Sequence, residues 1–94
     1  MAEIDARLAA IAERFAAQAE ETAAEIKAAL DGEDWSGLAR HSHSLAGRAG
    51  MFGYGAIGSA ARLVEEAVDA GLPADAIARR TQCLLEEMAA LNRS

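Results

Sequence analysis

Apolar and small side chains recur every three or four residues along the chain, which is the spacing of one face of an α-helix. Near the N-terminus this stripe consists of Ile4, Leu8, Ile11, Phe15, Ala19, Thr22, Ile26 and Leu30. The positions between them are rich in charged residues, mostly glutamate. The pattern predicts one amphipathic helix over residues 2–30, with a bend or a break near its middle.

The residues that follow carry signals for a helix end and a new helix start. Gly32 is suited to the left-handed conformation that often closes a helix. Asp34 is suited to the N-cap position, where its carboxylate can accept from exposed backbone N–H groups. A second helix is therefore expected from Trp35 to Met51.

The same spacing continues to the end of the chain. The stripe of the second helix is Trp35, Leu38, Ser42, Leu45, Ala49 and Phe52. A turn is expected at residues 50–55, which contain three glycines. A third helix, residues 56–70, would bury Ile57, Ala60, Ala61, Val64 and Val68, and a fourth, residues 73–92, would bury Ile77, Leu84, Met88 and Leu91. Gly71 is expected to end the third helix, and Pro73 suits the first turn of the fourth.

Four helices joined by short connections favour antiparallel neighbours. We therefore predict an all-α fold, an antiparallel up-and-down four-helix bundle, as a single domain over residues 1–94. A monomer is expected, and a smaller bundle completed by dimerisation is the alternative. Met51 and Phe52 are expected to close the core at the end of the second helix, and Cys83, beside Leu84, to act as a small buried hydrophobe.

Charge and composition exclude several classes of function. Nine basic residues stand against fifteen acidic ones, a formal net charge of −6, and no basic patch suggests nucleic-acid binding. No apolar run approaches the roughly 20 residues needed to span a bilayer. The single cysteine and an N-terminus without the features of a secretion signal lead us to expect a cytoplasmic location.

The chemistry-bearing residues gather in the second helix, where His41 and His43 point in different directions. At roughly 100° per residue, His41 lies about 80° from the core direction and His43 about 120° from it on the other side. His43 is thus the exposed histidine and His41 a flanking one. Ser36, Arg40, Gly47 and Gly50 share the sector of His43.

Glycine at position 47 leaves the ring of His43 uncovered. A helical side chain leans towards the N-terminus, so the residue at i+4 normally covers the side chain at i. Glycine inside an exposed helix costs about 1 kcal/mol relative to alanine, and this alanine-rich helix nevertheless carries it. An exposed, mostly neutral imidazole with a clear approach can act as a nucleophile towards another protein.

Residues 43–47, HSLAG, followed by RAGMFG at 48–53, resemble the signature of histidine-containing phosphotransfer (HPt) domains. That signature is roughly His-x-Leu-Lys-Gly, then small residues, a hydrophobic residue and glycine. Ala60, Leu63, Glu65 and Glu66 in the next helix also fit the family. The four-helix layout extends the resemblance over nearly the whole chain.

The resemblance implies that His43 is phosphorylated and carries the group between aspartates of receiver domains. The partners would be the receiver domains of hybrid histidine kinases and of response regulators. The receiver is expected to bring Mg²⁺ and the acidic pocket, so this chain would need no cofactor and would be a carrier rather than an enzyme.

One position departs from the family signature. Where the family usually has lysine, this chain has Ala46, which cannot hold phosphoryl oxygens. Arg40, at i−3 of His43, is the best substitute by direction, and Arg48 points well to the side. Ser36, Gly47 and Gly50 are the remaining candidates for holding the phosphoryl group or docking a partner.

Two other functions compete. A helical adaptor without phosphoryl chemistry could bind a signalling partner through the surface of the second helix, and the alanine at position 46 favours it. A hydrolase built on the two histidines is disfavoured because no nucleophile, base and orienting group lie at suitable spacing. The i, i+2 spacing of the histidines does not suit a metal site, and Glu65 with Glu66 is expected to form a solvated face.

Overall fold

The computed structural model describes residues 2–91, apart from the side chains of residues 2–6, 8 and 12. Its elements are four helices: α1 (Ala2–Asp31), α2 (Trp35–Met51), α3 (Gly55–Asp69) and α4 (Ala74–Ala90). The predicted helices are thereby confirmed: the bounds of α2 agree, and the other ends differ by at most two residues. Residue 92, the predicted end of the last helix, lies outside the described residues. The predicted break in the first helix is absent, because α1 is continuous. Ile4 and Leu8 lie outside the described side chains.

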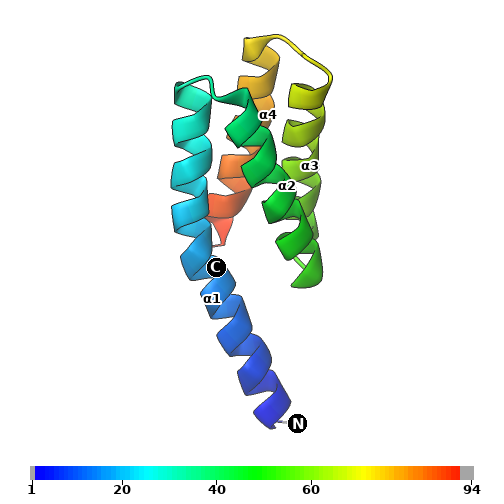
Figure 1. The fold of residues 1–94 in the computed structure, drawn as a ribbon. Helices are drawn as coiled ribbons and strands as arrows, with labels where there is room; N and C mark the ends of the chain where they lie inside the picture. The colour runs from blue at the N-terminus through cyan, green and yellow to red at the C-terminus, as the bar shows by residue number, and fades with distance from the viewer. Residues whose placement is uncertain (1, 92–94) are drawn as a thin grey trace.

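The helices run alternately up and down, as Figure 1 shows. Each packs against two others, in the ring α1–α2–α3–α4 and back to α1. This arrangement confirms the antiparallel up-and-down bundle. The molecule is elongated, 49 × 19 × 18 Å, because the N-terminal part of α1 (blue in Figure 1) extends beyond the other three helices. Within the described part of the chain, no helix combines the length and apolarity needed to span a membrane.

The core follows the predicted stripes and contains many alanines. Its buried hydrophobic members are Phe15, Ala19, Ile26, Ala29, Leu38, Leu45, Ala46, Ala49, Ile57, Ala61, Val64, Ala67, Ile77, Leu84 and Met88. Three hydroxyl side chains, Thr22, Ser42 and Thr81, are also buried. Of these, the Thr81 hydroxyl donates to the carbonyl of Ile77 at 2.8 Å. Small side chains let neighbouring helices pack closely. This close packing brings side chains of different helices into contact at the candidate site.

Four residues expected in the apolar stripes or the core are exposed. Ile11 of α1 is 40% exposed. Met51 is 78% exposed, because it lies about 160° from the core direction of its helix. Phe52, just past the end of α2, is also exposed, although its ring still contacts Phe15 at a centroid distance of 5.6 Å. Cys83 is exposed, because the one-residue step from Leu84 turns its side chain out of the buried stripe.

The connection between α1 and α2 differs from the prediction in one residue. Glu33, not Gly32, has the left-handed backbone, with φ 54°. Asp34 is the N-cap of α2, as predicted, and its carboxylate accepts from the backbone N–H of Gly37 at 3.0 Å. A β-carbon at position 37 would collide with that carboxylate, so the glycine keeps the cap in place.

The connection between α3 and α4 contains the predicted end signals. Gly71 has φ +66°, the left-handed conformation expected after a helix. Pro73 is the N-cap of α4, one position before the helix begins, rather than a member of its first turn.

The cap of α2 should contribute measurably to stability. We expect Asp34→Ala to lower the free energy of unfolding by about 1 kcal/mol, because the first turn of α2 loses its acceptor. Urea denaturation measures the loss. Asp31→Ala is the control: it removes an exposed ion pair with Lys27 (3.0 Å) and should cost less than about 0.5 kcal/mol. Equal losses in the two variants would contradict the role of the cap.

Candidate functional site

His43 lies near the middle of α2, on the side that borders α3. Its side chain is 75% exposed, whereas that of Glu65 on α3 is 27% exposed. The Nδ1 atom of His43 lies 2.9 Å from Oε2 of Glu65. The ring is therefore open to solvent on most of its surface and contacts a carboxylate of the neighbouring helix on one side.

The contact with Glu65 distinguishes the two ring nitrogens. A carboxylate is an acceptor only, so a proton on Nδ1 is favoured at this distance. With the proton on Nδ1, the lone pair of a neutral ring is on Nε2. An ion pair this exposed adds at most about 1 kcal/mol to stability. Its main consequence is the orientation of the ring.

A shallow hollow surrounds this pair between α2 and α3. It is lined by His43, Ala46, Gly47, Arg62, Glu65 and Glu66. The hollow thus combines an imidazole, two carboxylates and one guanidinium group from two helices. Sequence periodicity treats each helix alone and missed both Arg62 and the contact of Glu65 with His43. Glu65 was expected on a solvated face, and the structure corrects that expectation.

Gly47 and Gly50 leave bare backbone beside the ring. A β-carbon built at either position would have no atom of the protein within 4 Å, apart from its own helix backbone and chain neighbours. The predicted clear approach over the turn after His43 is therefore present. Ser36 and Arg40 are exposed on α2 but do not line the hollow.

Ala46 faces the contact between α2 and α3. Only 5% of it is exposed, and a β-carbon at Gly58 of α3 would lie 3.6 Å from its carbonyl oxygen. The departure from the family signature thus lies in a tightly packed contact between two helices. A small side chain at position 46 suits this packing.

His41 faces the opposite neighbour. Its side chain is 30% exposed, and its Nδ1 atom lies 3.3 Å from Oε2 of Glu25 on α1. It lines a separate hollow with Ser44 and Arg48. The two histidines therefore contact different helices, and His41 is the flanking residue that the sequence predicted.

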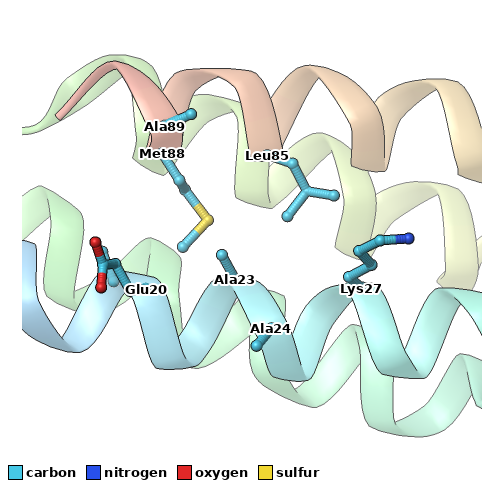
Figure 2. Close-up of a pocket in the computed structure, with 8 residues that line it drawn as sticks. Glu20, Ala23, Ala24, Lys27, Leu85, Met88 and Ala89 are labelled. Atoms are coloured by element: carbon cyan, nitrogen blue, oxygen red, sulfur yellow. The ribbon is translucent and has the colours of Figure 1, made fainter. Parts of the chain in front are cut away.

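A further hollow lies between α1 and α4, as Figure 2 shows. Ala23 and Ala24 of α1 line it opposite Leu85 and Met88 of α4, and the charged groups of Glu20 and Lys27 lie towards its two ends. Its lining contains no histidine, cysteine or hydroxyl side chain. It therefore offers no imidazole that could carry a phosphoryl group.

Comparison with known proteins identifies a family for this chain. The family model described as "Hpt domain" matches residues 10–94. Neither the curated proteins nor the solved structures contain a significant match to the chain.

Glycine at position 47 should lower the free energy of unfolding, and replacement by alanine should raise it again. We expect Gly47→Ala to raise the free energy of unfolding by about 0.5–1 kcal/mol, because alanine is the better helix former and meets no neighbour there. Gly53→Ala is the matched control. Gly53 has φ +83°, so the same change there should destabilise the protein by about 1 kcal/mol. Urea denaturation of both variants checks the two signs, and a destabilised Gly47→Ala would show that position 47 is not open.

Proposed function

Because the chain belongs to the Hpt domain family, we propose that His43 is the residue on which it carries a phosphoryl group. Hpt domains act in phosphotransfer within two-component signalling and interact with receiver domains. The observation that carries the assignment to His43 is its exposed ring, with Nδ1 against Glu65 and a bare turn beside it. The other histidine, His41, contacts α1 instead.

In the proposed step, the Nε2 lone pair of His43 attacks the phosphorus of an aspartyl phosphate on a receiver domain. The Nε2–P bond forms, the P–O bond to the aspartate breaks, and the aspartate leaves as a carboxylate. The ring becomes positively charged during the attack, and its Nδ1–H faces the carboxylate of Glu65. The reverse step delivers the phosphoryl group to the aspartate of a second receiver.

The roles are divided unevenly between the two proteins. Phosphoryl transfer depends mainly on positioning and on charge stabilisation. The receiver domain would supply Mg²⁺ and an acidic pocket. This chain would supply a nucleophile that is held in one orientation on a rigid helix.

We propose that the exposed face of α2 docks the receiver. Ser36, Arg40, Gly47 and Gly50 share the sector of His43. A partner backbone can approach closely over the two glycines, where no side chain intervenes. Arg40 supplies a positive charge at the edge of this face, which suits the acidic surroundings of a receiver aspartate.

The alternative is an adaptor that binds a signalling partner through the same face without carrying phosphate. The alanine at position 46, in place of the family's lysine, is the observation that favours it. Such an adaptor would bind its partner equally well whether or not position 43 is histidine.

Replacing His43 separates these two functions. We expect a phosphorylated receiver domain to label the wild-type chain in an acid-labile, base-stable form, as a phosphoramidate bond requires. His43→Gln should abolish the label, and His41→Gln should retain it. Transfer from radiolabelled receiver domains, followed by acid and base treatment, provides the measurement. A label that persists in His43→Gln would exclude His43 as the carrier, and binding without any label would favour the adaptor.

Glu65 should affect the rate of phosphorylation more than stability. We expect Glu65→Gln to slow labelling by about ten- to hundredfold, because the ring loses the group that orients it and balances its charge. The free energy of unfolding should change by less than about 1 kcal/mol, since the pair is exposed. Labelling time courses measure the rate, and ¹⁵N chemical shifts of the His43 ring report which nitrogen carries the proton.

Glu66→Gln is the matched control for this experiment. Glu66 is adjacent in sequence, exposed, and lines the same hollow, but its carboxylate makes no ion pair or hydrogen bond with His43. It should label at close to the wild-type rate. Equal slowing in the two variants would indicate a general effect of negative charge rather than the specific contact of Glu65.

A further inference from the structure

We propose that Arg62 is the phosphoryl-binding cation of this chain and takes the role that Ala46 cannot fill. The proposal rests on the phosphorylation of His43 proposed above. On the sequence alone, Arg40 of α2 was the best substitute for the family's lysine. The proposal gives this role to Arg62 of α3 instead.

Arg62 lies on the same side of α3 as Glu65. The two are three residues apart, so they are neighbours on the helix surface, and both line the hollow with His43. Because α2 and α3 are antiparallel, Arg62, which precedes Glu65, lies towards the Gly47 side of His43. The missing side chain at Gly47 leaves open space there for a long guanidinium group and a phosphoryl group together.

The guanidinium of Arg62 is available for a ligand. Within residues 2–91, the structure gives Arg62 neither an ion pair nor a hydrogen bond. Two other cations of the described residues are engaged: Arg80 donates to the carbonyl of Leu63 at 3.0 Å, and Lys27 pairs with Asp31. Arg40 is as free as Arg62, so the position of Arg62 at the hollow is what distinguishes it. A guanidinium group matches phosphate oxygens in a two-pronged geometry.

The charges of the hollow require such a cation once the phosphoryl group is present. Two carboxylates, Glu65 and Glu66, and one guanidinium line the hollow. A phosphoryl group adds close to two further negative charges at neutral pH. Without Arg62, the phosphorylated ring would face like charges alone. Arg40 does not line the hollow, and on α2 it points away from the side that borders α3.

The test uses phosphoramidate as a small donor, so that no partner protein contributes a charge. The P–N bond of phosphoramidate breaks, the phosphoryl group bonds to Nε2 of His43, and ammonia leaves. A ³¹P NMR titration of the phosphorylated chain then measures the pKa of the phosphoryl group itself. A nearby cation lowers this pKa, whereas a purely structural residue does not alter it.

We expect Arg62→Ala to raise the phosphoryl pKa by roughly half a unit, and Arg62→Lys to restore most of the difference. Arg40→Ala, which removes an exposed arginine of α2 that lies outside the hollow, is the matched comparison and should raise the pKa by clearly less. A shift in Arg40→Ala but not in Arg62→Ala would overturn the proposal in favour of Arg40. No shift in either variant would overturn it as well.

The same experiments distinguish failure of the carrier role of His43 from failure of the role of Arg62. If phosphoramidate and phosphorylated receivers both leave His43 of the wild-type chain unlabelled, the carrier role itself is wrong and the role of Arg62 is lost with it. If the wild type is labelled at His43 and the Arg62 variants have the same phosphoryl pKa as the wild type, the carrier role stands and Arg62 has no part in it.

Discussion

The contact between α2 and α3 through small residues is the constraint on which the candidate site depends. Ala46 is buried against α3, and Gly58 of α3 lies against the backbone of Ala46 and Gly50. A β-carbon at Gly58 would already be in van der Waals contact with α2, 3.6 Å from the carbonyl oxygen of Ala46, so a side chain larger than alanine there would push the two helices apart. Because the helices lie close together, the carboxylate of Glu65 reaches the ring of His43 at 2.9 Å. The site therefore belongs to two helices, although the family signature lies on one.

The many small side chains also determine which residues stabilise the rest of the bundle. Alanines bury little apolar area each, so the few large side chains carry much of the hydrophobic stabilisation. Phe15 of α1 stacks on Tyr54 at a centroid distance of 4.8 Å and also contacts Phe52. These aromatic contacts connect α1 to the glycine-rich turn between α2 and α3. They hold the end of α2 and so help to fix the helix that carries His43.

The net negative charge of the chain also bears on the site. Positively charged side chains stabilise a negatively charged phosphoryl group. This chain has nine basic residues against fifteen acidic ones. At the hollow between α2 and α3 the protein combines an orienting carboxylate with a single arginine. The net charge of −6 favours interaction with positively charged surfaces over negatively charged ones.

The sequence by itself determined the helices, their alternation, most of the core, the exposure of His43 and the bare turn at Gly47. Each of these depends on spacing within one helix, which a 3.6-residue period describes. It placed Met51 and Cys83 wrongly because a stripe does not specify how wide the buried face is or where it ends. The neighbours of His43 on α3, Glu65 at 2.9 Å and Arg62 in the same hollow, were decided only by the tertiary structure. Glu65 and Arg62 follow it by about twenty residues and lie on another helix, and which side of α3 meets α2 depends on how closely the two helices pack.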